Sequence, residues 1–160
     1  MSIRNGGPAD RVFLEAMLRE AVYPDDPSVS IAQVMQRPDL AMTIPDFSRA
    51  GDLALIEEDD GAALGAAWCR CFTHEAHSWG YIDSDTPEVG IAVVPDRRGQ
   101  GIGTRLLHAL MDRARLDGRT ALSLCTDPED RPLSMYVRAG FTPLVPLADD
   151  PDVFVMKAVL

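Results

Sequence analysis

The sequence predicts a mixed α/β (α+β) domain built around one mostly antiparallel sheet of about seven strands. Short apolar runs bounded by turn residues occur in succession between residues 53 and 94 and again between 141 and 157, which is typical of antiparallel hairpins. One long stretch of helical period, from Ile102 to the residue before Gly118, separates two of these runs. A strand, a helix and another strand in this order predict one right-handed β-α-β crossover.

The first part of the chain predicts a short strand followed by two helices. Residues 3–4 leave room only for a short strand, and Asp10 is a candidate N-cap for an amphipathic helix. Ser28 or Ser30 can cap a second, short helix. Residues 39–51 show no clear period, so we expect a loop there.

The rest of the chain completes an element order of β-α-α-β-β-β-α-β-α-β-β. Further strands are expected at residues 53–56, 62–72, 79–82 with a continuation at 88–94, 121–125, 141–145 and 153–157, and further helices at 102–117 and 130–139. There is no internal repeat and no linker long enough to separate domains. We therefore expect a single domain over residues 1–160.

Composition narrows the functional classes. A chain of 160 residues with 46% hydrophobic side chains can bury a core. Its net charge of −10 argues against nucleic-acid binding and is compatible with a cationic acceptor such as an amine. No apolar run approaches membrane-spanning length and no signal peptide is evident, so we expect a cytoplasmic protein without a membrane partner. The three cysteines, an odd number, argue against a disulfide framework.

The most informative stretch joins the strand ending at residue 94 to the long helix. Three glycines alternate between residues 99 and 103, and Arg97 and Arg98 precede them. A glycine turn between a strand and a helix presents backbone N–H groups and the positive end of the helix dipole to an anion. Arginines add forked donors for phosphate oxygens. Residues 98–103, which we call the glycine loop, therefore predict a phosphate-binding site.

The spacing of these glycines excludes two common phosphate-binding loops. A dinucleotide fingerprint would place glycine at Leu106, and a P-loop would place Lys followed by Ser or Thr at residues 104–105. The pattern that matches is R-x-x-G-x-G, formed by Arg98, Gly101 and Gly103. It resembles the pyrophosphate-binding loop of the GNAT superfamily, the acyl-CoA-dependent N-acetyltransferases.

This resemblance implies the GNAT fold, in which two central strands splay apart and the pantetheine arm of CoA lies between them. It also implies acetyl-CoA as co-substrate and no metal. The residues that it assigns to CoA are Ile91, Ala92, Val93, Val94, Arg98, Gly99, Gln100, Gly101, Ile102, Gly103, Thr104 and Asp130.

A second motif, at residues 135–141, resembles the L-Y-x-x-x-G-F signature of the family, with Met in place of Leu. The resemblance implies that Tyr136 approaches the CoA sulfur and protonates the leaving thiolate; a core tyrosine is the alternative. Many family members carry asparagine six or seven residues earlier, where this chain has Asp130 and Glu129. A carboxylate cannot donate a hydrogen bond, so one CoA contact is in doubt, and Asp130 can instead cap its helix.

Acetylation of an amine needs a proton acceptor, because an alkyl ammonium group is mostly protonated at neutral pH. Glu88, on the strand leading to the glycine loop, is the candidate base, since glutamate recurs at this position among relatives. Asp83 and Asp85 are alternatives on a nearby loop. The backbone N–H of Val93 or Val94 would polarise the thioester carbonyl.

The acceptor itself is not predicted beyond its chemical class. In this fold it lies over the first two helices and the hairpin near Trp68, His74, His77 and Trp79. Aminoglycosides, polyamines, amino acids and protein N-termini stay open. The resemblance also leaves a homodimer open, because dimers are common among relatives.

Two other interpretations compete with this one. Cys69, Cys71, His74 and His77 are four zinc-ligand types within nine residues, but their spacing is not that of a standard finger. The altered asparagine position favours a non-catalytic acyl-CoA-binding or sensor domain. The leading hypothesis is an N-acetyltransferase that transfers acetyl from acetyl-CoA directly to a primary amine of a small molecule or peptide in a ternary complex.

Overall fold

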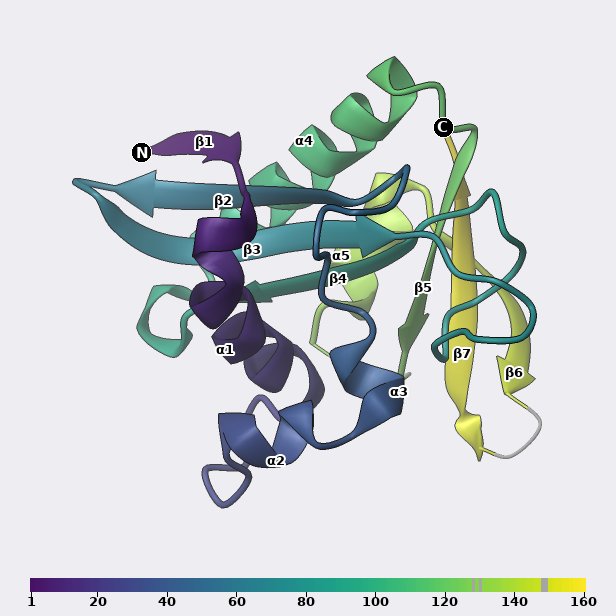
Figure 1. The fold of residues 1–160 in the computed structure, drawn as a ribbon, viewed down its shortest axis with the longest axis horizontal. Coiled ribbons are helices and arrows are strands. Elements are labelled where there is room, and N and C mark those ends of the chain that lie inside the picture. The colour runs from purple at the N-terminus through teal and green to yellow at the C-terminus, as the bar shows by residue number, and fades with distance from the viewer. Residues whose placement is uncertain (128, 130, 148–149) are drawn as a thin grey trace.

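The computed structural model describes residues 1–127, 129, 131–147 and 150–160. Its strands are β1 (Ser2–Asn5), β2 (Leu53–Asp59), β3 (Ala62–Arg70), β4 (Glu88–Val93), β5 (Ala121–Thr126), β6 (Thr142–Leu147) and β7 (Asp150–Val159). Its helices are α1 (Arg11–Val22), α2 (Ile31–Met35), α3 (Pro38–Ala41), α4 (Ile102–Leu116) and α5 (Leu133–Ala139) (Figure 1).

The strands of the described residues form one seven-stranded sheet in the order β1-β2-β3-β4-β5-β7-β6. Only the pair β4–β5 is parallel; every other neighbouring pair in this order is antiparallel. Helix α4 connects the two parallel strands, as expected for a single crossover. The predicted fold class is therefore confirmed, and α3 is an addition to the predicted element order.

Local signals account for most of the N-terminal elements. The Ser30 hydroxyl accepts the Gln33 N–H, and the Gln33 side chain accepts the Ser30 N–H, which is a capping box that starts α2. The loop predicted from residue 39 is partly wrong, because α3 begins at Pro38. Proline is well tolerated in the first turn of a helix, where its missing N–H would have no partner.

The strand predicted at residues 79–82 is wrong. The Asp83 carboxylate accepts the N–H groups of Asp85 and Thr86, which turns the chain before β4 begins. Further upstream, Tyr81 stacks on the His77 ring with centroids 4.3 Å apart. An alternation of aromatic and polar residues thus reflects packing within a loop here.

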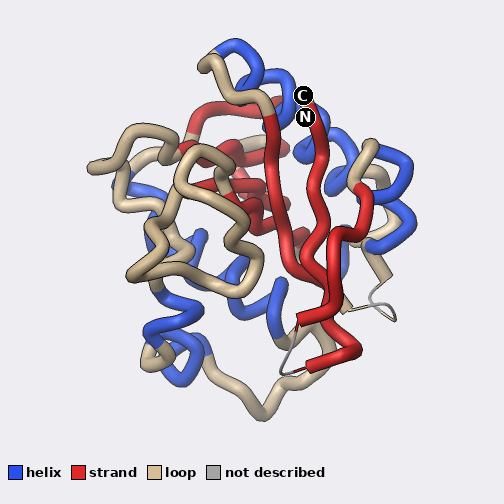
Figure 2. Tube along the Cα trace, turned by 90° about the vertical axis from the view of Figure 1, so that its right-hand side faces the viewer, coloured by secondary structure: helices blue, strands red, loops and turns tan. Residues whose placement is uncertain are grey.

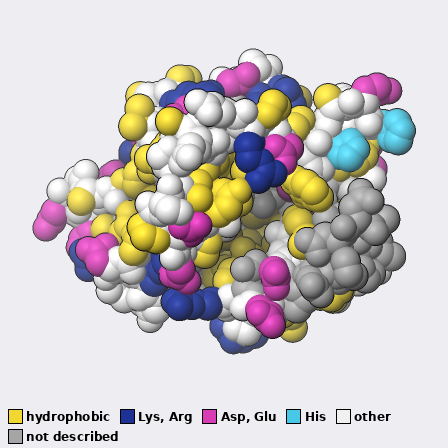
Figure 3. Space-filling view, turned by 90° about the horizontal axis from the view of Figure 1, so that it is seen from below, with side chains coloured by type: hydrophobic (Ala, Val, Ile, Leu, Met, Phe, Trp, Pro, Cys, Tyr) yellow, Lys and Arg dark blue, Asp and Glu magenta, His cyan; other side chains and the backbone are white. Residues whose placement is uncertain are grey.

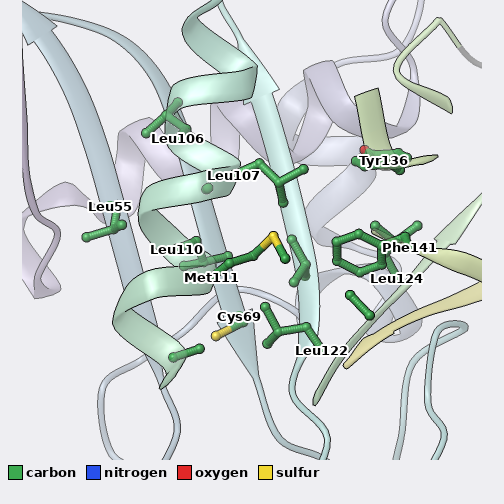
Figure 4. Packing of buried hydrophobic residues seen from close by; sticks show 14 of the residues in the cluster. Leu55, Cys69, Leu106, Leu107, Leu110, Met111, Leu122, Leu124, Tyr136 and Phe141 are labelled. Atoms are coloured by element: carbon green, nitrogen blue, oxygen red, sulfur yellow. The ribbon is translucent and has the colours of Figure 1, made fainter. Parts of the chain in front are cut away.

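Helices cover both faces of the sheet (Figures 1 and 2). Helix α4 packs on one face through six buried residues, which recur at helical spacing: Ile102, Leu106, Leu107, Leu110, Met111 and Ala114. They meet residues of β2, β3, β5 and α5 in one core cluster (Figure 4). Helices α1, α2 and α3 bury a second cluster against the opposite face. Among the described residues, no helix is long and apolar enough to cross a membrane.

The parallel strands β4 and β5 separate along their length. Their pairing is recorded at one position, Glu88 with Ser123, near the start of β4. On the other side of β4, the Val94 N–H donates to the Leu64 carbonyl at 2.9 Å, and the register with β3 is regular from residue 88 to 93. In an antiparallel pair, alternate residues point their N–H and C=O groups at the partner strand. Since Val94 bonds to β3, the N–H and C=O groups of Ile91 and Val93 point the other way, into the gap toward β5.

Candidate active site

A cavity of about 1160 Å³ opens where β4 and β5 diverge. Its walls come from α1 and α3, from the glycine loop and the start of α4, and from β5 and α5. The hollow is lined with hydrophobic side chains, and acidic and basic side chains stand around its rim (Figure 3). Ligand cavities commonly measure about 300–1,000 Å³, so this one is large enough for a sizeable ligand.

The glycine loop brings backbone donors to one end of this cavity. Gly99 and Gly101 have φ angles of 75° and 80°, in the left-handed region that favours glycine. Gly101 immediately precedes α4, whose first N–H groups have no acceptor within the helix. At Gly103, a Cβ would lie 3.4 Å from the Met135 sulfur, so α4 and α5 approach closely here. The loop is thus built to receive an anion.

An ion pair between a buried carboxylate and an exposed guanidinium fixes the far side of the glycine loop. The side chain of Glu57 on β2 is 1% exposed and accepts a hydrogen bond from Nε of Arg105 on α4 at 3.1 Å. The same guanidinium donates through Nη1 to the Gln100 carbonyl at 3.2 Å. The pair therefore ties the loop to the sheet before any ligand binds.

Arg98 lies at the cavity and is already paired. Its guanidinium donates to the carboxylate of Glu20 on α1 at 2.6 Å and to the carbonyl of Val93 at 3.3 Å. The neighbouring Arg97 is more exposed, with its nearest acid, Asp59, at 3.9 Å. An anion at the loop thus has two arginines beside it, one in a long ion pair with Asp59 and one held by Glu20 of α1.

Most residues assigned to CoA line the cavity: Ile91, Ala92, Val93, Arg98, Gly99, Gly101, Ile102, Gly103 and Thr104. Val94 and Gln100 do not. The Val94 N–H is already bonded to Leu64, which leaves Val93 as the expected donor to a carbonyl in the gap. Asp130 lies outside the described residues, whereas Glu129 lines the cavity.

Glu88 lines the cavity, and the residue as a whole is only partly buried. Burial raises the pKa of this carboxyl to about 7, while hydrogen bonds from the Gly80 N–H and the Ser78 hydroxyl oppose the rise. Oε2 is buried and has no hydrogen-bond partner in the described part of the chain. Glu88 can therefore exchange a proton near neutral pH with a group that enters the cavity.

The two alternative bases are placed differently. Asp83 and Asp85 do not line the cavity. The Asp83 carboxylate instead holds the turn before β4, and its hydrogen bonds to Thr86 and Asp85 lower its pKa despite the opposing effect of burial. The geometry therefore favours Glu88.

Tyr136 of α5 is a core residue that also lines the cavity. It is 7% exposed and packs edge-on against Phe141, with ring centroids 6.1 Å apart (Figure 4). It also lines the cavity, next to Met135, which contacts the start of α4. A side chain held by the core on one side and open to the cavity on the other is well positioned for chemistry.

Residues 16–141 match the family model described as "Acetyltransferase (GNAT) family". The chain belongs to this family. The diverging strands, the glycine loop and the crossover helix are thus features of a GNAT domain.

The individual relatives share 21–32% sequence identity with the chain. The chain is 32% identical over 90 residues to L-2,4-diaminobutyric acid acetyltransferase of Nocardia farcinica, a match that covers 54% of this chain and 40% of that enzyme. Ribosomal-protein-alanine N-acetyltransferase from Brucella melitensis has a similar structure, with a TM-score of 0.70, 21% identity and full coverage of both chains. The Salmonella typhimurium protein yncA, solved with its cofactor acetyl-CoA, gives a TM-score of 0.71 at 21% identity, over 99% of this chain and 93% of that one.

The cysteine and histidine residues of this GNAT domain do not gather into a metal site. Burial raises the pKa of the Cys69 thiol to about 12, and its Sγ lies 3.7 Å from the Gly51 carbonyl. His74 and His77 lie on the loop before β4, outside the cavity lining. Among the described residues, no three His, Cys, Asp or Glu side chains are placed to hold an ion.

Sequence reasoning missed three residues of the GNAT site: Glu20, Glu57 and Arg105. Glu20 and Arg98 are 78 positions apart, and no local pattern pairs them. An acid within the apolar β2 strand was the one available signal for Glu57. Of the four side chains expected near the acceptor, Trp68 and Trp79 line the cavity.

Proposed function

We propose that this chain is an N-acetyltransferase that transfers an acetyl group from acetyl-CoA directly to a primary amine of a small molecule or peptide. The observation that carries the proposal is the placement of Glu88. Its carboxylate oxygen Oε2 is buried and unpaired among the described residues, and Glu88 lines the same cavity as the glycine loop and Tyr136. Family membership supports acetyl transfer, and the acid–base groups support an amine acceptor.

The site fits acetyl-CoA as co-substrate, which supplies a thioester as the acyl donor. The N–H groups at the start of α4, together with Arg97 and Arg98, would hold the pyrophosphate. Since Arg98 is paired with Glu20, pyrophosphate has to compete with that carboxylate for the Arg98 guanidinium or share it. The backbones of Ile91 and Val93 would hydrogen-bond the pantetheine arm in the gap, and the Val93 N–H would polarise the thioester carbonyl.

Glu88 would act as the general base. A free alkyl ammonium has a pKa of about 10, so the bound amine must lose a proton before or during attack. The ammonium loses its first proton to solvent, and the neutral amine attacks. A carboxyl with a pKa of about 7 is substantially ionised at neutral pH and can take the second proton. As the nitrogen–carbon bond forms and the carbon–sulfur bond breaks, the nitrogen becomes acidic and passes this second proton to Glu88.

Tyr136 would act as the general acid. The departing thiolate needs a proton, and a phenol of pKa about 10 can donate to a thiolate whose acid has a pKa of about 8.5 at modest cost. Solvent then restores the tyrosine proton. Both named relatives with a stated acceptor, diaminobutyric acid and a ribosomal-protein alanine, present a primary amine, which agrees with this scheme.

The test is thiol release from acetyl-CoA across a panel of primary amines, with Glu88→Gln and Tyr136→Phe as variants. We expect acceptor-dependent turnover in the wild type and losses of about a hundredfold in each variant. Glu75→Gln and Tyr81→Phe are matched controls, because both residues lie on the loop before β4 and neither lines the cavity.

A non-catalytic CoA-binding or sensor domain is the second candidate. The carboxylate of Glu129 at the cavity, near the position where relatives carry an amide, is the observation that favours it. Calorimetry with CoA separates the two, because a sensor would bind CoA and release no thiol with any amine in the panel.

A further inference from the structure

Two residues that line the cavity each have a buried polar atom without a partner among the described residues. One is Oε2 of Glu88, and the other is Nε1 of Trp68 on β3. Trp68 is 1% exposed and lines the cavity. An indole N–H is a donor only, and a donor removed from water without an acceptor is unfavourable. The proposed mechanism explains the Glu88 oxygen and leaves the Trp68 N–H without a function.

The position of the indole is fixed by a contact across the sheet. Trp68 pairs with Gly90 of β4, and its ring lies directly over that glycine. A Cβ at Gly90 would come within 2.3 Å of Cε2 and 2.6 Å of Nε1. The absence of a side chain at residue 90 therefore lets Nε1 reach β4 at the point where that strand leaves β5.

Trp68 Nε1 and the Glu88 carboxyl lie on the same side of β4. Glu88 and Gly90 are two residues apart, so their side-chain positions face the same way and their Cα atoms are about 7 Å apart along the strand. Trp68 belongs to the core cluster under α1, α2 and α3. This is the half of the cavity away from α4, where the acceptor would lie.

We propose that Trp68 is a specificity residue for the acceptor, which is an amine carrying a hydrogen-bond-accepting oxygen a few bonds from its nitrogen. The amine meets Oε2 of Glu88 while the oxygen accepts the Nε1–H of Trp68. Amino acids, their amides and peptide N-termini have this arrangement, whereas simple alkylamines and polyamines do not. The inference rests on the proposed function and narrows its acceptor class.

Selectivity follows from the cost of an unpaired donor. A site with a buried polar group rejects an analogue that cannot bond it, because the group then stays unpaired. An alkylamine would leave Nε1 as it is in the free protein, whereas a carbonyl, carboxylate or hydroxyl oxygen would satisfy it. One such bond is expected to give about a tenfold preference in kcat/KM.

The experiment replaces the N–H of Trp68 and keeps the ring shape. Site-specific incorporation of β-(3-benzothienyl)alanine exchanges the N–H for sulfur, so packing over Gly90 is retained. The probes are glycinamide, glycine, ethanolamine and propylamine, measured for kcat/KM with saturating acetyl-CoA. For each oxygen-bearing amine, the ratio of its kcat/KM to that of propylamine is compared between the wild type and the Trp68 replacement. This comparison cancels intrinsic differences in amine reactivity.

The matched control is the same replacement at Trp79. Its Nε1 also lies at the cavity wall but already donates to the Asp39 carboxylate at 2.9 Å. We expect the replacement at Trp68 to lower the preference for at least one oxygen-bearing probe about tenfold and the replacement at Trp79 to leave that preference unchanged. The probe affected, amide, carboxylate or hydroxyl, identifies the oxygen. Equal preferences in wild type and the Trp68 protein would overturn the inference.

A binding measurement separates this inference from the proposed function. Calorimetry of the same four amines against the protein saturated with CoA gives affinities without turnover. If no amine is acetylated but glycinamide, glycine or ethanolamine loses affinity with the Trp68 replacement, the proposed function fails and the inference stands. If amines are acetylated and neither rates nor affinities respond to the replacement, the inference fails and the proposed function stands.

Discussion

Replacing Glu88 by glutamine is expected to increase stability and remove activity at the same time. Burial raises the pKa of this carboxyl from 4.5 to about 7. At about 1.4 kcal/mol for each pH unit, this difference corresponds to about 3 kcal/mol of folding free energy. A raised pKa means that the folded protein holds this proton more tightly than the unfolded chain. The cost of ionisation therefore begins above pH 4.5 and is complete above about pH 7.

Urea denaturation of the wild type and Glu88→Gln at pH 5 and pH 8 measures this cost. Glutamine cannot ionise, so the variant should gain about 2–3 kcal/mol relative to the wild type between these two pH values. The exposed Glu75→Gln variant should show no such gain, because its side chain is hydrated in both states. Stability differences that do not change with pH would contradict the buried-carboxyl interpretation.

The activity of the same variant tests the catalytic role. In the wild type, kcat/KM calculated for the neutral form of the amine should rise about tenfold for each pH unit below 7 and level off above it, because only the ionised carboxylate accepts a proton. Glu88→Gln should lower kcat/KM about a hundredfold and lose the step near pH 7. A variant that keeps the wild-type pH profile would show that another group is the base.

Three further predictions concern other parts of the site. Tyr136→Phe should lower kcat about a hundredfold with little change in either KM, because it removes the proton donor; steady-state kinetics with an unchanged kcat would contradict this. Glu57→Gln should raise the KM for acetyl-CoA about tenfold and affect kcat less, since Arg105 then holds the glycine loop more weakly; an unchanged KM would remove Glu57 from this role. Gly90→Ala should destabilise the protein by about 1–3 kcal/mol in urea denaturation, because its Cβ would meet an indole ring at 2.3 Å, whereas Gly7→Ala, with nothing within 4 Å, should cost much less. Equal losses in the two glycine variants would show that the ring moves freely.

Short-range sequence patterns predicted the helices and strands that depend mainly on neighbouring residues. The apolar period of α4 and the alternating glycines before it specify a strand, a turn and a helix within twenty-odd neighbouring residues, about the length of one β-α unit. The strand predicted at residues 79–82 is wrong because contacts beyond these residues determine their conformation. Tyr81 stacks on His77 of the same loop and Trp79 donates to Asp39 of α3, while β3 and β5 already occupy both edges of β4.

The sequence predicted only those cavity residues that belong to a short sequence motif. The glycine loop, Glu88 and Tyr136 belong to such motifs, and the structure brings all three to one cavity. Contacts between distant segments leave no local pattern. The pairing of Glu20 with Arg98 and the stacking of Trp68 on Gly90 depend on the register of the whole sheet, so they emerge only from the folded structure.

The gap between β4 and β5 creates two strand edges in the interior of a sheet. Exposed edges ordinarily invite pairing with strands of other chains, which leads to aggregation. Here α1 packs on one face of β4 and α4 on the other, so a second polypeptide cannot approach these edges broadside. What fits is a slender, extended molecule that enters end-on and offers amide groups at intervals along its length. The two strand edges that could cause aggregation are thus open only to a ligand of this shape, and the restriction comes from the backbone and not from side chains.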